Sequence, residues 1–335
     1  MRPTTPRVGP GTTLRVAPRP ACPTCGEPGP VTHGGPQDRF YAVLGQCDLR
    51  RCGQAGCGTV WLDPCPVAEG IPKLYATYYA HGSRGTADPV GRVGPLRESA
   101  LGPVLWLRAA DRGRLLDVGC GSEVFLRTMT DLGWSVSGVE PHPAAAGIAR
   151  AKGLRVVTGT IEAARFPAGA FDIVTMSHVL EHVTDPLGAL RECGHVLAPG
   201  GRLIAVTPNA LSHGARTFGA AWMGWDPPRH LVAFSPDSLR NTLTVAGLTG
   251  VRVGTLARSA RITSRVSRQI RDHGSALNMH CGFQPGRVPI GVEKRNGAFF
   301  RWRRLTTTIR PPGRATSGGT RHGQGYQEVG AGAGD

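Results

Sequence analysis

The sequence lacks any long apolar run. Nowhere in its 335 residues do about 18 consecutive apolar side chains occur, so we expect no membrane-spanning helix. The first twenty residues, MRPTTPRVGPGTTLRVAPRP, are basic and rich in Pro and Thr, and they lack the apolar segment of a secretory signal. We therefore expect a cytoplasmic protein that does not associate with membranes.

Acidic residues are scarce beside basic ones. The chain carries 23 Asp and Glu against 39 Lys and Arg, a formal net charge of +16. Most of the excess lies in residues 1–20 and 251–335, whereas residues 21–250 hold twenty basic and nineteen acidic side chains. This middle part has no basic stripe with interleaved aromatic residues, the pattern typical of nucleic-acid binding. We interpret the charge as solvated tails, and a nucleic-acid partner is the less favoured alternative.

Cysteine is not scarce, and its distribution is uneven. Six of the nine cysteines fall within residues 22–65. An odd, clustered set without a secretory signal indicates metal ligation and not a disulfide framework. CPTCG and RCGQAGCGTVWL each supply two thiolates at a ligand spacing, which predicts a closed, structural zinc site. The predicted ligands are Cys22, Cys25, Cys52 and Cys57. A degraded ribbon, or one that uses Cys47, is the alternative.

Composition divides the chain into six segments. They are a disordered basic tail (1–20), a zinc-ribbon-like module (21–66), a connector (67–112), an α/β domain (113–256), an extension without a clear assignment (257–300) and a second disordered basic tail (301–335). The connector contains Tyr75, Tyr78 and Tyr79, for which packing is favoured over lining an acceptor pocket. RVPIGVEK, residues 287–294, is a candidate final strand.

Residues 113–256 alternate between two patterns. Short apolar runs that end at Gly or a polar residue predict strands: RLLDVG, SVSGVE, RVVTGT, FDIVTMS and RLIAVTPN. Segments with helical spacing separate them, and SPDSLRNTLTVAGL begins with a Ser cap followed by Pro. Repeated strand–helix units predict a Rossmann-like, doubly wound, mostly parallel sheet covered on both faces. Ligands of such sheets bind at the carboxyl ends of the strands.

The first strand ends in the glycine-rich stretch DVGCG. Its glycines allow a sharp turn and a close approach to a ligand, although such a loop alone does not identify the ligand. Glu140 ends the second strand about twenty residues later, where an acid accepts hydrogen bonds from ribose hydroxyls. Glu123 occupies the place where the pattern leads one to expect a third glycine.

Five stretches in this order and spacing resemble class I S-adenosylmethionine-dependent methyltransferases. They are LLDVGCG, GVEP, FDIVTMSHVLEHVTDP, VLAPGGRLIAVTPN and WDPPRHLVAFSPDSL, and the likeness covers roughly residues 20–256. The chain is similar to the subgroup in which a cysteine-rich module precedes the catalytic domain. The resemblance implies S-adenosylmethionine as cofactor and a structural Zn²⁺.

The resemblance also assigns roles along the sheet edge. It implies that the loop wraps the methionyl group, that the acid after the second strand holds the ribose, that Thr160 and Ile161 flank the adenine, and that Ser177 and His178 line the methyl-donor side. The implied cofactor-binding residues are Asp117, Gly119, Cys120, Gly121, Glu140, Thr160, Ile161, Ser177 and His178.

Glu123 departs from the family pattern. A bulky anion at this position can crowd the methionyl group or repel its carboxylate. At a helix N-terminus the same acid is favoured by about 0.3–1 kcal/mol, and it can pair with the cofactor's α-ammonium group. Because the later motifs are intact, we predict that cofactor binding is retained.

Methyl transfer requires alignment of donor and acceptor, exclusion of water and, for some acceptors, removal of a proton. SHVLEH places Glu181 and His182 beside the expected methyl group, and histidine titrates near neutral pH. WDPPRH ends in His230, which with Trp225 and Arg229 can close over the acceptor. Structural alternatives are that His182 packs at a helix start and that WDPPRH braces a loop.

Three hypotheses follow. The leading one is a methyltransferase acting on O or C of a small-molecule acceptor of the sugar or secondary-metabolite type. The second is an RNA methyltransferase, which the basic tails favour and the neutral middle does not. The third is a non-catalytic scaffold whose cofactor loop is disabled by Glu123. The sequence carries no indication of the oligomeric state.

Overall fold

The computed structural model describes eight parts of the chain. These are residues 14–35, 37–40, 47–71, 74, 112–121, 123–256, 260–276 and 304–310. Within these ranges no helix combines the length and the apolar character that crossing a bilayer requires. The candidate strand RVPIGVEK and the tyrosines of the connector lie outside the described residues.

The N-terminal module, residues 14–71 as far as described, is built from short strands. They are β1 (Val16–Ala17), β2 (Val31–His33), β3 (Asp48–Arg51), β4 (Val60–Asp63) and β5 (Cys65–Pro66), followed by the 3-10 helix η1 (Ala68–Gly70). β1 pairs with β5, and β2, β3 and β4 form an antiparallel sheet. A fourth strand, β11 (Val232–Ala233), joins β4 from much later in the chain.

The second part of the chain forms the predicted α/β domain. Its main sheet consists of β6 (Arg114–Val118), β7 (Ser135–Glu140), β8 (Val156–Thr158), β9 (Phe171–Ser177), β10 (Leu197–Thr207), β12 (Thr249–Leu256) and β13 (Arg304–Arg310). The strand order is β12-β13-β10-β9-β6-β7-β8. The five strands from β10 to β8 are parallel, and β13 runs antiparallel to both of its neighbours. The prediction of a Rossmann-like, mostly parallel sheet is confirmed.

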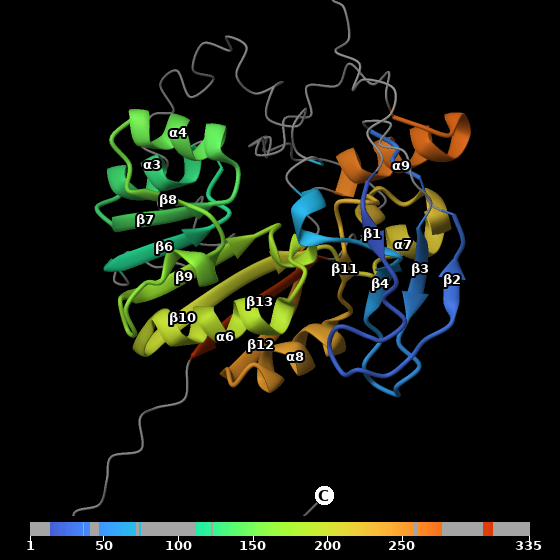
Figure 1. Ribbon diagram of the computed structural model, residues 1–335, viewed down its shortest axis with the longest axis horizontal. Coiled ribbons are helices and arrows are strands. Elements are labelled where there is room, and N and C mark those ends of the chain that lie inside the picture. The colour runs from blue at the N-terminus through green and yellow to red at the C-terminus, as the bar shows by residue number, and fades with distance from the viewer. Residues whose placement is uncertain are drawn as a thin grey trace, which may run out of the picture.

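Helices follow most of the strands. They are α3 (Val124–Asp131), α4 (Pro143–Ala151), α5 (Ile161–Ala164), α6 (Pro186–Val196), α7 (His213–Phe218), α8 (Pro236–Val245) and α9 (Ala260–His273), with the 3-10 helices η3 (Leu180–His182), η4 (Gly219–Ala221) and η5 (Met223–Trp225). The predicted cap at the start of α8 is confirmed, because Ser235 accepts from Ser238 N–H and Pro236 is the first helical residue. Figure 1 shows α3 and α4 beside β7 and β8, and α6 and α8 toward β10 and β12.

The central strand β6 buries side chains on both faces. Leu115 and Leu116 are consecutive and fully buried, and their side chains point to opposite sides of the sheet. Leu115 packs in a cluster with Leu126 of α3, whereas Leu116 packs in the larger cluster that contains Leu190 of α6. This apolar run is therefore continuous because helices cover both faces.

Both predicted disordered tails contain ordered structure, which corrects the prediction for those residues. In the tail predicted for 1–20, Leu14 is buried, and Trp61 Nε1–H donates to the Arg19 carbonyl at 2.7 Å. In the tail predicted for 301–335, residues 304–310 form β13 between β10 and β12. The physical reason is long-range pairing: β13 bonds to two strands that lie far away in sequence, and a local composition rule does not detect such partners.

Helix α9 lies in residues 257–300, whose secondary structure was not predicted from the sequence. Val266 and Ile270, four residues apart, are buried against Phe40 of the N-terminal module and Met223 of η5. The Ser267 hydroxyl accepts from Met223 N–H at 2.9 Å. α9 thus packs on η5, which ends at the first residue of WDPPRH. Figure 1 shows α9 beside α7 as well.

The N-terminal module and the α/β domain share one interior. Cysteines and strand residues of the module belong to the same apolar cluster as β9 and α6 residues. Ser235 donates to the Cys57 carbonyl at 3.3 Å, and Leu62 N–H donates to the Leu231 carbonyl at 3.0 Å. The module therefore packs directly on the segment that leads from η5 to α8.

Candidate functional site

The predicted cofactor residues gather at the carboxyl edge of the parallel strands. β6 and β9 are neighbours in the sheet. β7 and β8 lie beyond β6, and β10 lies beyond β9 on the opposite side. The chain direction across the sheet therefore reverses between β6 and β9, which is where open α/β sheets bind ligands. All nine predicted residues lie at the carboxyl ends of β6, β7 and β9 or in the segments that follow β6, β8 and β9.

The loop after β6 turns tightly over the end of β7. The backbone N–H groups of Gly119 and Cys120 both donate to the Val139 carbonyl, at 2.8 and 3.1 Å. Gly119 has φ +70°, and a Cβ added there would lie 2.4 Å from Val179 Cγ2. Gly121 has φ +62° and faces open space. The loop therefore leaves room for a ligand at Gly121 and none for a side chain at Gly119.

Glu140 supports this loop. Its carboxylate is 3% exposed and accepts from Gly121 N–H at 2.9 Å and from His142 N–H at 2.8 Å. The sequence predicted a ribose contact for Glu140, and the structure shows in addition that the carboxylate fixes the loop conformation. The two backbone donors thus hold the carboxylate at the carboxyl end of β7.

Asp117, at the carboxyl end of β6, is a buried acid beside a second acid. Thr175 donates a 2.6 Å hydrogen bond to its Oδ1. Burial and then the charge of Glu140 raise the pKa of Asp117 to about 7, although the Thr175 hydrogen bond opposes the shift. Asp117 therefore titrates near neutral pH, and a cation placed beside it would favour its ionised form.

The remaining predicted cofactor residues flank the same edge. Thr160 is exposed and caps α5, and Ile161 is buried in the core. Ser177 is the exposed last residue of β9. His178 follows with φ +58°, a conformation that is uncommon for a residue with a side chain, and its backbone N–H donates to the Val206 carbonyl at 2.7 Å. Strained backbone of this kind is concentrated at functional sites.

Glu123 adopts φ +139° as the residue before α3. Its carboxylate forms an ion pair with Lys152, which follows α4. The second carboxylate oxygen is buried and has no hydrogen-bond partner among the described residues. The side chain is thus held by a lysine of the domain, with one acceptor atom left over.

A second group of polar side chains lies just beyond β9. Glu181 and His182 belong to η3, and His230 lies between η5 and β11. One ligand atom of each lies within 4.8 Å of those of the other two. The two imidazole rings meet edge to face with centroids 4.6 Å apart. The structure therefore brings together the three predicted catalytic residues from two motifs about fifty residues apart in sequence.

Hydrogen bonds fix the proton positions of both imidazoles. His182 Nδ1 lies 3.0 Å from the Arg229 carbonyl, and His230 Nδ1 lies 2.8 Å from the Gly224 carbonyl. Since a carbonyl oxygen only accepts, Nδ1 of each ring carries a proton. This assignment follows from the hydrogen-bond partners.

Burial sets the charges of this group. Burial, followed by repulsion from His230, lowers the pKa of His182 to about 4, while the carboxylate of Glu181 opposes the shift. Burial alone would raise the pKa of Glu181, but a hydrogen bond with His178 at 3.1 Å and the nearby imidazoles outweigh it, and the pKa falls to about 2. At neutral pH the group is thus an ionised carboxylate beside a neutral imidazole.

Trp225 and Arg229 do not face an acceptor. Trp225 is 2% exposed and donates from Nε1 to the Gly219 carbonyl. Arg229 is 1% exposed and binds the carboxylates of Asp38 and Asp226. The alternative that WDPPRH braces a loop is confirmed for these two residues, and the expectation that they close over the acceptor is wrong.

Sequence reasoning missed Asp38. Its side chain is buried, and it accepts two hydrogen bonds from the Arg229 guanidinium at 2.8 and 3.0 Å. The two residues are 191 positions apart, so no local pattern connects them. The one available signal was that Asp38 is one of four acids in the turn-rich residues 21–66, which is not specific.

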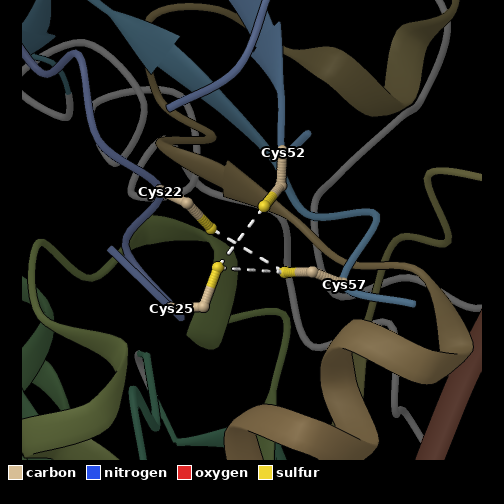
Figure 2. A group of neighbouring side chains, drawn as sticks. All are labelled: Cys22, Cys25, Cys52 and Cys57. Atoms are coloured by element: carbon tan, nitrogen blue, oxygen red, sulfur yellow. Dashed lines mark hydrogen bonds between the residues drawn. The ribbon is translucent and has the colours of Figure 1, made fainter. Parts of the chain in front are cut away.

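The four predicted metal ligands converge in the N-terminal module (Figure 2). Their sulfur atoms lie 3.4 Å (Cys25 and Cys52) and 3.8 Å (Cys22 and Cys57, Cys25 and Cys57) apart. Four thiolates bound tetrahedrally at 2.3 Å would be about 3.8 Å apart, so the geometry fits Zn²⁺. Cys47 is buried outside this group, and a site that uses it is not supported among the described residues.

Comparison with known proteins agrees with this geometry. Residues 96–253 match the family model described as a methyltransferase domain. These residues are thus similar to methyltransferase domains. The match supports a class I S-adenosylmethionine-dependent methyltransferase. A relative from Xanthomonas oryzae, named ubiquinone biosynthesis O-methyltransferase, is 34% identical over 132 residues, which are 37% of this chain and 54% of the relative. The chain thus spans about half the length of the curated relatives it matches.

Solved structures resemble the chain more distantly. A methyltransferase from Archaeoglobus fulgidus is 21% identical with a TM-score of 0.43, covering 64% of this chain and 93% of its own. A possible histamine N-methyltransferase from Thermotoga maritima is 21% identical with a TM-score of 0.42, covering 64% and 94%. The fold assignment rests on the strand order described above.

Proposed function

We propose that the protein transfers a methyl group from S-adenosylmethionine to an oxygen or carbon atom of a small-molecule acceptor. The observation that carries the proposal is the grouping of Glu181 and His182, which follow β9, with His230, which precedes β11. The group lies just beyond β9, after which one of the loops predicted to hold the cofactor begins. The relatives named for O-methylation support an oxygen acceptor. The sugar or secondary-metabolite class of the acceptor belongs to the proposal.

The described residues fit the cofactor. Gly121 faces open space, Glu140 retains acceptor capacity for ribose hydroxyls, and the leftover carboxylate oxygen of Glu123 can accept from an α-ammonium group. Thr160 would lie at the adenine, and Ser177 and His178 on the methyl side. When bound, the cofactor supplies an activated methyl group on a sulfonium.

The chain's own residues would orient the acceptor and manage its proton. His182 is neutral at pH 7, and its Nε2 lone pair can take the proton of an acceptor hydroxyl. Glu181 would stabilise the imidazolium that results, because its ionised carboxylate lies beside the ring. His230, packed against His182, would contact the same acceptor from the opposite side.

We further propose that the N-terminal module holds a structural Zn²⁺ through Cys22, Cys25, Cys52 and Cys57. The sulfur distances support it, and a closed four-thiolate site leaves no position for catalysis. The zinc would fix β4, on which the strand β11 beside His230 pairs.

Calorimetric titration with S-adenosylmethionine tests the cofactor site. The wild-type chain is expected to bind, and Gly119→Ala is expected to lose at least about tenfold in affinity, roughly 1.4 kcal/mol, because the new Cβ meets Val179. Gly153→Ala is the matched control, since Gly153 has φ +80° but open space around it, away from the loop. Glu123→Gly is expected to bind no more tightly than the wild type, because it removes an acceptor for the α-ammonium group.

Two outcomes would contradict the proposal. The first is no heat with wild-type protein whose circular dichroism shows a folded chain. The second is binding by Glu123→Gly alone, which would mean that the carboxylate of Glu123 disables the loop and would favour the scaffold hypothesis.

The pKa of Asp117 predicts a pH dependence of cofactor affinity. Ionised Asp117 attracts the cofactor's cationic groups, and below pH 7 the acid is protonated because its pKa is raised to about 7. Affinity is therefore expected to rise with pH up to about 7 and then to level off, with at most a tenfold change per pH unit. Titrations from pH 5.5 to 8.5 measure it. Asp117→Asn should bind weakly at every pH, and an equally steep pH profile in this variant would refute the assignment.

A further inference from the structure

We propose that Glu181, His182 and His230 together bind a divalent cation, in a second metal site separate from the four cysteines. The three side chains are held on η3 and on the loop before β11, at the acceptor side of the sheet edge. The arrangement of the three side chains supports cation binding independently of the proposed function. Its use in acceptor binding rests on the function proposed above.

The donor atoms converge and one of them lacks a protein partner. Each residue offers a ligand atom within 4.8 Å of the other two. Glu181 is fully buried, and its Oε2 has no hydrogen-bond partner among the described residues. An ionised carboxylate oxygen that is buried without a partner is costly, and a bound cation supplies the missing interaction.

The supporting hydrogen bonds are those of metal-binding histidines. His182 and His230 each donate Nδ1–H to a backbone carbonyl, of Arg229 and Gly224, which leaves Nε2 of each ring as the nitrogen that can bind a cation. Histidine ligands almost always donate their other ring N–H to a carbonyl, a carboxylate or water, which fixes the tautomer and the ring orientation. The other oxygen of Glu181 is held by His178 at 3.1 Å. All three ligands are therefore oriented without a metal being needed to place them.

The surrounding charge also favours a cation. The carboxylate of Asp226 lies 3.9 Å from His230 Nε2, so it adds negative potential close to the site. Arg229, the nearest guanidinium in the same loop, is fully engaged by Asp38 and Asp226 and faces the interior. Two carboxyl groups and two imidazole rings thus surround the position.

The donor set indicates the kind of cation. Two imidazole nitrogens and one carboxylate suit Zn²⁺, Fe²⁺ or Co²⁺ and do not suit Mg²⁺, which prefers oxygen ligands. Three protein ligands leave a coordination position open, unlike the four-cysteine site. A hydroxyl oxygen of the acceptor bound there would lose its proton to water more readily. That oxygen would then form the new O–C bond, while the C–S bond of the donor breaks and sulfur keeps its electron pair. With the cation bound, His182 is a ligand and the proton of the acceptor passes to water; without the cation, His182 takes that proton as proposed above.

Co²⁺ titration of the full chain tests the inference, because Co²⁺ reports its ligands by absorption. With zinc already in the cysteine site, the wild type is expected to take up one further equivalent with visible bands and no thiolate charge-transfer band. Glu181→Gln and His230→Gln are each expected to weaken this binding by more than about 100-fold, since loss of supporting residues alone costs 10–100-fold. His195→Gln, an exposed histidine on α6, is the control and should bind like the wild type.

Three results would overturn the proposal. They are no further uptake by the wild type, a thiolate band for the added ion, or unchanged binding in both variants. His230→Gln decides the matter if Glu181→Gln fails to fold. Titration of the same samples with S-adenosylmethionine separates the two claims: cofactor binding without Co²⁺ uptake removes the metal site alone, and Co²⁺ uptake without cofactor binding removes the proposed function alone.

Discussion

Replacing Cys52 by Ser, or removing zinc with a chelator, is expected to unfold the N-terminal module. The module's strands are two to four residues long, and its interior is small, so its hydrophobic core alone contributes little stability. In zinc-finger peptides structural Zn²⁺ contributes about 10–16 kcal/mol, and we expect a loss on the order of 5 kcal/mol or more here. Fluorescence of Trp61, which is fully buried on β4, measures the transition.

The effect should reach the α/β domain. β11 pairs with β4, and Leu231 N–H, next to β11, donates to the Glu181 carbonyl at 2.7 Å. Hydrogen bonds therefore connect the sheet of the module to η3. The zinc-free chain is therefore expected to lose turnover as well as Trp61 burial, whereas residues of β6 and β7 remain folded and keep their amide protection in hydrogen exchange.

Cys47→Ser is the matched control for Cys52→Ser. Cys47 is also buried in the module, but its thiol lies outside the group of four. We expect Cys47→Ser to keep one zinc per cysteine site and most of its stability. Equal zinc loss in both variants, or a wild-type chain that folds fully without zinc at the cysteines, would contradict a structural four-cysteine site.

The sequence predicted the main sheet well because local patterns carry it. Each central strand is a buried apolar run, and Ser235 followed by Pro is a helix start that depends only on neighbouring residues. β13 was missed because its stability comes from pairing with β10 and β12 on both sides. RLTTTIR contains four consecutive β-branched residues, which favour a strand, but the Gly- and Arg-rich sequence around it does not.

The candidate site was predictable in its parts and not in its assembly. The motifs gave Glu181, His182 and His230, and the fold explains why two loops bring them together. The motifs did not show that the carbonyls of Gly224 and Arg229 fix the imidazole tautomers. Backbone acceptors of this kind depend on loop conformation and leave no mark in the residue types.

Replacing Arg229 by Met is expected to destabilise the whole chain strongly. The guanidinium makes two hydrogen bonds to Asp38 and two to Asp226, and the side chains of Arg229 and Asp38 are essentially inaccessible to solvent. Removing the cation leaves a buried carboxylate without compensation, which costs about 3–5 kcal/mol. Urea unfolding of wild type and variant measures the difference in the free energy of unfolding.

A double-mutant cycle separates the ion pair from simple loss of packing. Asp38→Asn combined with Arg229→Met should cost less than the sum of the single variants, because the second change removes the uncompensated charge. Arg240→Met is the control: Arg240 pairs with Asp237 at the surface at 3.1 Å, and such pairs contribute about 0–1 kcal/mol. Additive effects in the cycle, or equal losses for Arg229 and Arg240, would show that the buried pair does not join the module to the loop. The carbonyl of Arg229 holds His182, so a true coupling should also lower turnover in Arg229→Met at urea concentrations where the chain is still folded.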